Sequence, residues 1–356
     1  MSGTVLFRCN VSASVGIGHL MRCREMARYL KEIGWRTVLL GPPESLRQSQ
    51  DEMLFDRWCD VERRGSSEED AARVLALCDT EGARHVVMDD YRIDPPYQAM
   101  LRRAGLRWLQ QFDASNPWMF QPDLLVNASP FERREDYLPW LETPERTRTL
   151  FGPSYAVLRP AFAALAGADS PPRVDGREVR RVLVAFGGGD DRGAIAQALR
   201  VLAGRLGPSV TLVIVSGGAN PQRDDIARSV AQLPAGQAEF HVNPPDMTAL
   251  MRDCDLALIG GGTMSYEAAI CGLPMVFVGL APNQERPCLG WQALTGALFL
   301  GLVGTVEDAQ LYAAVSSLIE DRDRRRDMAA RGRELVDGKG TQRLVNALLE
   351  RKRDRL

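Results

Sequence analysis

Three times along the chain, a short apolar run leads through glycines into a helical pattern. The apolar runs are residues 5–7, 182–186 and 256–259, and they lead into SASVGIGHLMRC, GGGD and GGGTMSYE. A glycine turn between a strand and a helix lets backbone N–H groups come close to an anion at the helix N-terminus. Neither GGG stretch continues as a P-loop, and neither has the full G-x-G-x-x-G spacing. The pattern therefore predicts anion-binding turns in an α/β protein.

The first half of the chain alternates apolar strand patterns with amphipathic helix patterns. Strands are expected at 37–40, 85–88, 106–112 and 124–127, and helices at 20–33, 69–77 and 96–104. This alternation predicts a parallel sheet with helices on both faces. Ligands of such sheets bind at the carboxyl ends of the strands, where the loops 10–19, 89–91 and 113–116 carry polar side chains.

A small, polar, Pro-containing stretch at 164–178 separates this half from a second one that begins in the same way. The second half has strand patterns at 182–186, 210–215, 238–242, 256–259 and 275–278, and a last helix at 341–350. A chain of 356 residues exceeds one ordinary core, so two domains are expected, 1–165 and 176–356. The expected fold class is α/β: two Rossmann-like domains whose parallel sheets face a cleft between them.

Composition excludes several classes of function. The formal net charge is −2, which predicts neither a nucleic-acid surface nor a polybasic membrane patch. No apolar run approaches the ~18 residues of a spanning helix, and the N-terminus lacks a signal-peptide pattern. Seven cysteines without a C-x-x-C pair are typical of reduced thiols, so a cytoplasmic location is expected. With three histidines a dedicated zinc site is not expected, and neither a metal nor a cofactor is predicted.

Two polar side chains in the glycine turns have both a chemical and a structural interpretation. His19 falls in the first helical turn, where the positive end of the helix dipole favours the neutral ring that a general base needs. It could equally be a histidine that caps a tight turn. Glu267 could accept hydrogen bonds from ribose hydroxyls, or it could stabilise the dipole of its own helix.

The opening RCNVSASVGIGHLMRCREMA resembles the start of the UDP-sugar hydrolases of pseudaminic acid biosynthesis, which typically read R-x-D-x-S-x-x-I-G-x-G-H-x-x-R-C. Further similar stretches follow in the same order: DDYRID, PDLLVNAS, GPSYAVLRPAF, AFGGGDDRG, GGGTMSYEAAICGLP, APNQE and DGKGTQRLV. The resemblance covers most of the chain. It implies the GT-B fold, which that family shares with the transferase that adds N-acetylglucosamine to the lipid-linked murein precursor.

The resemblance also implies a metal-independent hydrolysis of a UDP-linked diacetamido-trideoxyhexose, with UDP held mainly by the C-terminal domain. His19 matches the catalytic histidine, which activates water, and Tyr91 matches the tyrosine near the reacting sugar. Glu267 matches the ribose-binding glutamate. The full substrate-binding set is Asn10, Ser14, Gly16, Gly18, Asp113, Gly188, Gly189, Gly261, Gly262, Thr263, Met264, Glu267, Asn283 and Gln284.

Three departures from the family pattern lie on the expected sugar side. Asn10 replaces an aspartate, Arg92 replaces a glycine beside Tyr91, and Ala114 replaces one aspartate of a pair. The nature of the sugar therefore stays open, as does the oligomeric state. Two other functions remain: a glycosyltransferase of the same fold, and a nucleotide-sugar-binding protein without turnover.

Overall fold

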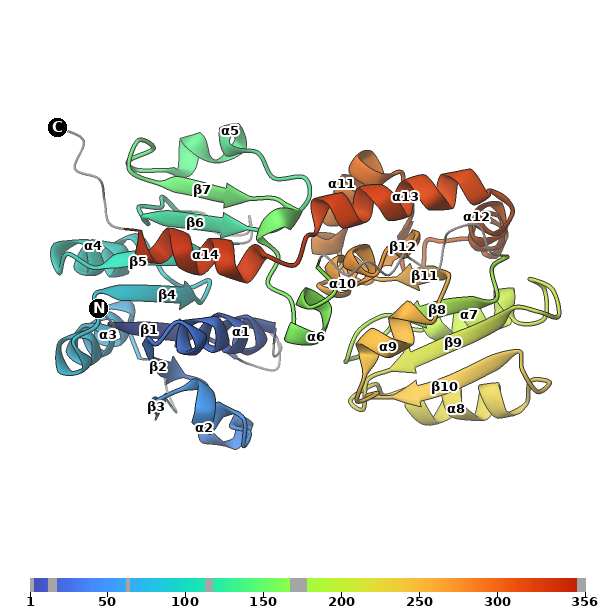
Figure 1. The fold of residues 1–356 in the computed structure, drawn as a ribbon, viewed down its shortest axis with the longest axis horizontal. Helices are drawn as coiled ribbons and strands as arrows, with labels where there is room; N and C mark the ends of the chain where they lie inside the picture. Colours follow the sequence, from blue (N-terminus) through green and yellow to red (C-terminus); the bar gives the residue numbers. More distant parts are fainter. Residues whose placement is uncertain (1–2, 12–17, 62–64, 113–117, 167–177, 351–356) are drawn as a thin grey trace. The chain divides into compact units, whose positions relative to one another are not determined.

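The structure is a computed structural model that describes residues 3–11, 18–61, 65–112, 118–166 and 178–350 (Figure 1). The chain forms two compact units. Unit 1 consists of Met1–Ala128, Glu132–Arg159 and Lys339–Leu356, and unit 2 of Ser129–Phe131 and Pro160–Gly338. The division between the main segments thus falls at Arg159 and Pro160, earlier than the expected 165, and the end of the chain belongs to unit 1.

Unit 1 is built on one parallel sheet. Within the described residues this sheet has seven strands in the order β3-β2-β1-β4-β5-β6-β7. Their bounds are β1 Thr4–Cys9, β2 Arg36–Gly41, β3 Arg57–Asp60, β4 His85–Asp89, β5 Arg107–Gln111, β6 Leu124–Asn127 and β7 Arg148–Phe151. The helices of this unit are α1 Gly18–Glu32, α2 Asp51–Leu54, α3 Ser67–Glu81, α4 Pro95–Arg103, α5 Arg134–Tyr137 and α14 Gly340–Leu349, with short 3₁₀ turns at Glu44–Leu46, Leu138–Trp140 and Pro153–Tyr155.

Successive side chains of β1 point to opposite faces of the sheet, and both faces are covered. Val5, Phe7 and Cys9 pack in one cluster with apolar residues of α1 and α14. Leu6 packs in the other with residues of α3 and α4. A strand buried on both faces reads as a continuous apolar run, and this explains why the sequence pattern was clear here.

The last helix, α14, was expected in the second domain, but it belongs to unit 1 (Figure 1). Its apolar residues pack in a core cluster of that unit. Leu344, Val345 and Leu348 are fully buried in the cluster that includes α1. The Arg107 guanidinium of β5 donates to the carbonyl oxygens of Ala347 (3.0 Å) and Leu348 (2.9 Å), which have no partner inside the helix. The helix therefore completes the first sheet's cover.

Unit 2 repeats the architecture. Its described strands form a six-stranded parallel sheet in the order β10-β9-β8-β11-β12-β13. The strands are β8 Arg181–Ala185, β9 Thr211–Ser216, β10 Ala238–Val242, β11 Leu256–Ile259, β12 Met275–Gly279 and β13 Leu298–Leu302. The helices are α6 Pro160–Ala163, α7 Ala194–Leu202, α8 Arg223–Ala231, α9 Met247–Arg252, α10 Met264–Ile270, α11 Glu285–Thr295, α12 Asp308–Glu320 and α13 Arg322–Leu335, with a 3₁₀ turn at Pro282–Gln284. Both sheets have the doubly wound Rossmann order, so the prediction of an α/β protein with two Rossmann-like domains is confirmed.

Candidate functional site

The loops that follow β1 and β4 begin side by side at the carboxyl edge of the first sheet. Cys9 and Asp89, the last residues of these strands, are partners in the sheet register. The backbone N–H of Asn10 donates to the Asp89 carbonyl oxygen at 3.1 Å. Because β2 and β3 lie on the other side of β1, the strand order reverses between β1 and β4. Ligands of open α/β sheets bind at such a reversal, so this edge is the first candidate site.

His19 lies at this edge with one ring nitrogen fixed by Asp89. The helix α1 begins at Gly18, which places His19 in the first turn, as predicted, and leaves it only 4% exposed. Its Nδ1 lies 2.8 Å from Oδ1 and 2.9 Å from the backbone oxygen of Asp89. Since both of these atoms accept hydrogen bonds, Nδ1 carries a proton, and in the neutral ring the lone pair is on Nε2.

The helix dipole alone favours the neutral ring of His19, but the pKa of His19 is raised in the structure. Burial lowers this pKa, but the hydrogen bond and the negative charge of Asp89 outweigh burial and raise it above the usual histidine value. Burial raises the pKa of Asp89, yet the charges and hydrogen bonds of Arg22 and His19 bring it down to about 2. The carboxylate is therefore charged at neutral pH, and the dipole is not what decides the state of the imidazole.

Arg22 holds the other side of the same carboxylate. Its Nε donates to Oδ2 of Asp89 at 2.9 Å and its Nη2 donates to Oδ1 at 2.8 Å, so the ion pair is bidentate. We call these three residues the His19–Asp89–Arg22 cluster. Sequence reasoning missed Asp89 and Arg22 as site residues, although both stood in quoted motifs, DDYRID and H-x-x-R-C.

Tyr91 packs against His19 from the loop after β4. The two ring centroids are 4.6 Å apart and the ring planes make an angle of 75°. This edge-to-face arrangement is a favourable one for aromatic pairs and restricts the orientation of the imidazole. The structure thus brings together the two residues that were predicted to be catalytic.

Arg92, one of the departures from the family pattern, is fixed by a buried carboxylate. Asp90 accepts from the Arg92 backbone N–H (3.0 Å), from Nε (2.8 Å) and from Nη2 (2.7 Å). Asp90 is fully buried and also faces the buried Arg8 at 3.6 Å. The Arg92 side chain is nevertheless 43% exposed, so a guanidinium is held in place beside Tyr91.

Not every predicted residue of this unit can be placed. Asn10 and Gly18 are half-buried where the β1–α1 loop begins and ends. Ser14, Gly16, Asp113 and Ala114 lie outside the described residues.

The second candidate site is the matching edge of the unit 2 sheet, where the strand order reverses between β8 and β11. Gly188, Gly189 and Gly262 are exposed in the loops that follow these strands. A Cβ added to any of the three would meet no atom of the described structure within 4 Å. Packing inside the protein therefore does not account for glycine at these positions, and the space over the backbone is open.

Gln284 connects two of the loops at this edge. Its Oε1 accepts from the backbone N–H of Gly261 at 3.1 Å and of Leu280 at 2.9 Å. Gly261 fits tightly, because a Cβ there would lie 2.5 Å from Sγ of Cys288. The Gln284 side-chain oxygen thus positions the glycine loop after β11.

The remaining predicted residues of unit 2 lie where this loop enters α10. Thr263 is the N-cap residue and Met264 the first residue of the helix. Glu267 is half-buried in the first turn, and Asn283, in the loop after β12, is exposed. The glycine loop therefore ends in a helix N-terminus, which the sequence predicted.

Arg192 supplies a cation at this edge that sequence reasoning missed. Its backbone has φ +56°, which is uncommon outside glycine. The Asp190 side chain stabilises this conformation by accepting from the Arg192 N–H at 2.8 Å, and Arg192 Nη1 donates to the Leu280 carbonyl at 2.7 Å. No regular pattern reveals such a residue, because its placement depends on a loop far along the chain.

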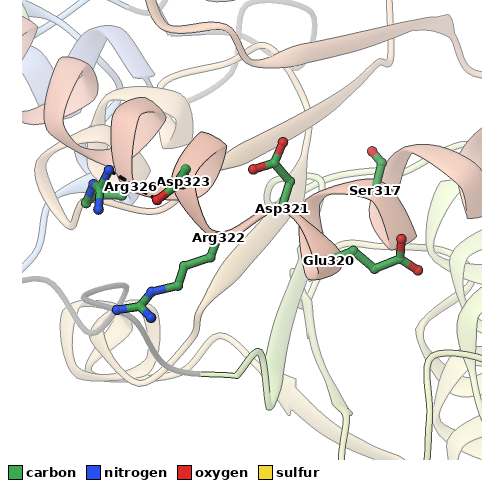
Figure 2. Close-up of a pocket in the computed structure, with 6 residues that line it drawn as sticks. All are labelled: Ser317, Glu320, Asp321, Arg322, Asp323 and Arg326. Atoms are coloured by element: carbon green, nitrogen blue, oxygen red, sulfur yellow. Dashed lines mark ion pairs between the residues drawn. The ribbon is translucent and has the colours of Figure 1, made fainter.

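A hollow of about 730 Å³ lies elsewhere in unit 2, where α12 meets α13 (Figure 2). It is lined by Ser317, Glu320, Asp321, Arg322, Asp323 and Arg326. Figure 2 shows that these side chains fan outward and do not converge on one point. None of the predicted site residues lines this hollow.

The part of the chain that the structure describes also bears on metal and membrane sites. Within it, no group of three or more histidine, cysteine, aspartate or glutamate residues is arranged to hold a metal ion. No helix there has the length and hydropathy needed to span a membrane.

Known proteins resemble the chain in sequence and in fold. No protein-family model matches the chain. The chain is 32% identical over 207 residues to the spore coat polysaccharide biosynthesis protein SpsG of Bacillus subtilis, across 57% of this chain and 58% of that protein. The chain thus spans little more than half the length of this relative.

Solved structures that resemble the chain cover nearly all of it. MurG of Acinetobacter baumannii superposes with a TM-score of 0.66 at 15% identity, over 98% of this chain and 99% of that one. The chain has the GT-B fold. HepE of Anabaena, solved with UDP and glucose, gives a TM-score of 0.59 at 15% identity over 97% and 99%. At these identities, the likeness of this SpsG-like GT-B protein to solved structures concerns the fold alone.

Proposed function

We propose that this protein is an enzyme that hydrolyses a UDP-sugar at the anomeric carbon. The observation that carries the proposal is a histidine at the strand-order reversal whose Nδ1 is fixed by a charged carboxylate. In the neutral ring this arrangement leaves Nε2 as a base. The SpsG likeness and the GT-B fold support a nucleotide sugar as the substrate.

In the proposed reaction, Nε2 of His19 takes a proton from water while the water oxygen bonds to the anomeric carbon. The bond between that carbon and the UDP oxygen breaks, and its electron pair leaves with UDP. Asp89 stabilises the imidazolium that forms, as a carboxylate partner does in other histidine-based sites. Tyr91 keeps the ring in its orientation.

The edge of unit 2 suits the diphosphate. The backbone around Gly188, Gly189 and Gly262 is open, and α10 begins directly after this last glycine loop. A helix N-terminus and exposed N–H groups favour negative charge, and they favour it more as charge develops on the leaving UDP. Arg192 adds a fixed positive charge to the same edge.

For the sugar we propose a UDP-linked diacetamido-trideoxyhexose, as the sequence resemblance implies. The guanidinium of Arg92, clamped by Asp90, is the feature that would set this protein's preference apart from that of the family. A panel of UDP-sugars with different substituents therefore belongs in the first assay.

The first experiment incubates the purified protein with that panel, without any acceptor, and follows UDP and free sugar by mass spectrometry. Hydrolysis predicts equal amounts of UDP and free sugar, with one ¹⁸O in the sugar when the reaction runs in H₂¹⁸O. The rate should be the same in EDTA, since we propose no metal. UDP formation only with an added acceptor would instead support transfer, which the GT-B fold makes the second candidate. Binding of UDP without release from any substrate would mean a protein without turnover.

A second experiment tests the nucleotide side of the proposal. Glu267→Ala should weaken UDP binding by about 1–3 kcal/mol, the scale of a lost charge-assisted hydrogen bond to a ribose hydroxyl. Calorimetry with UDP measures this directly. Glu334→Ala, an exposed glutamate on α13, is the matched control and should leave UDP affinity unchanged. Equal affinity of the Glu267 variant and the wild type would show that this carboxylate serves its own helix.

A further inference from the structure

We propose that Arg22 is a positioning residue that acts through Asp89 to oppose protonation of His19, and so favours the neutral ring that acts as a base. The inference rests on the proposed role of His19 in catalysis. Its physical content, the control of one histidine by one arginine, can nevertheless be measured in the free protein without any substrate.

The geometry makes Arg22 and His19 competitors for one carboxylate. Asp89 Oδ1 lies 2.8 Å from Nδ1 of His19 and 2.8 Å from Nη2 of Arg22. Arg22 also holds Oδ2, at 2.9 Å. His19 and Arg22 are three residues apart on α1, so the helix presents both to the same neighbour. Because Asp89 is only 1% exposed, water does little to screen its negative charge.

The other groups that face this cluster do not take over the role of Arg22. Tyr91 comes from the loop after β4, and its ring packs on the imidazole. The thiols of Cys9 and Cys23 are fully buried nearby, and burial raises the pKa of Cys23 well above its usual value. A neutral thiol and a phenol bring no positive charge, so Arg22 provides the cation that balances Asp89 when the imidazole is neutral.

Asp89 and Arg22 therefore have opposite effects on the protonation of His19. Asp89 alone would favour the imidazolium strongly, because a buried carboxylate favours a positive partner. Arg22 places a positive charge next to the ring. This charge disfavours the positively charged imidazolium and thereby lowers the pKa of His19. The two opposing charges leave an imidazole that is oriented by Asp89 but still able to accept a proton.

The test measures the pKa of His19 by NMR in Arg22→Met and Arg22→Gln. The chain has three histidines, and His85→Gln and His241→Gln assign their signals. We expect the His19 titration to move to higher pH by about one unit when Arg22 loses its charge, the scale of one close charge. Arg22→Lys, which keeps the charge, should restore most of the wild-type titration. Arg28→Met is the matched control, since Arg28 is on the same helix and pairs with Glu25 at 3.2 Å.

Circular dichroism shows whether Arg22→Met and Arg22→Gln, the two variants without the charge, are folded. One folded variant is enough for the NMR measurement. An unchanged or lower His19 pKa in the folded variant would overturn the inference. Once a substrate is known, the acidic limb of the kcat/KM profile should move with the NMR titration, while a purely structural role for Arg22 would lower the rate at every pH. If the NMR shift occurs but the wild type turns over no UDP-sugar, the proposed function fails and the control of His19 by Arg22 stands.

Discussion

His19→Asn is expected to lower kcat/KM by at least ~10²-fold, and up to ~10⁴-fold, the usual contribution of general base catalysis. Asparagine keeps part of the shape and can still donate to Asp89, but it has no nitrogen that can take a proton from water. His19 and the glycine loops of the second sheet belong to different compact units, so UDP affinity should stay close to that of the wild type. Steady-state kinetics and calorimetry with UDP measure the two effects separately.

The companion variants make this result specific. His19→Ala should lose as much activity, and His241→Asn, at a half-exposed histidine of unit 2, should lose none. Near-normal turnover of His19→Asn would mean that His19 is structural, and Asp113 would then be the next base to test. If the variant lost both UDP binding and turnover, the structure of the β1–α1 loop, and not the imidazole as a base, would be the important feature.

The sequence predicted most strands well, the edge strand β10 among them, and missed the other three edge strands of the described sheets. The strands 124–127, 238–242 and 256–259 were predicted with the bounds that the structure has. The missed strands, β3, β7 and β13, each lie at an edge of a sheet. All their residues except Leu150 are at least partly exposed, so the continuous apolar run that marks a doubly covered strand is absent.

The last helix shows a different limit. Its amphipathic pattern predicted a helix at 341–350, close to the observed Gly340–Leu349. The pattern gives an apolar face but not the sheet on which that face packs. Gly340 passes so close to Ala156 that a Cβ would lie 2.1 Å from the carbonyl oxygen, and such a return crossing cannot be read from local periodicity.

The candidate site was predictable in its types of residue but not in their partners. His19 stood out because a histidine in a glycine turn is chemically distinctive. Asp89 lies 70 residues further on and meets His19 only because β1 and β4 are neighbours in the sheet. Local periodicity cannot reveal such a pairing, so the orientation and pKa of His19 required the fold.

The second large effect is expected at Gly262. Gly262→Val should weaken UDP binding by about 100-fold, or about 2.7 kcal/mol, because the new side chain would fill the space where we propose that the diphosphate lies. The free protein should tolerate the change. Gly262 is exposed, its φ is not positive, and a Cβ there meets no described atom within 4 Å.

Two other substitutions separate this ligand effect from damage to the protein. Gly261→Val puts a Cβ 2.5 Å from Sγ of Cys288, so it should lower the free energy of unfolding by about 1–3 kcal/mol, as overpacking does. Ala330→Val adds apolar volume at an exposed position of α13 and should change neither property. Thermal unfolding and calorimetry on the three variants give the comparison.

UDP affinity and stability, compared across the three variants, distinguish an effect on the ligand from an effect on packing. A Gly262 variant as stable as the wild type that has lost UDP affinity would show that the absent side chain serves the ligand, because nothing in the free protein needs it to be absent. Undiminished UDP affinity in that variant would place the diphosphate elsewhere. Reduced stability in it would mean that the loop packs more tightly than its open surroundings indicate, and the role of the glycine would then be structural.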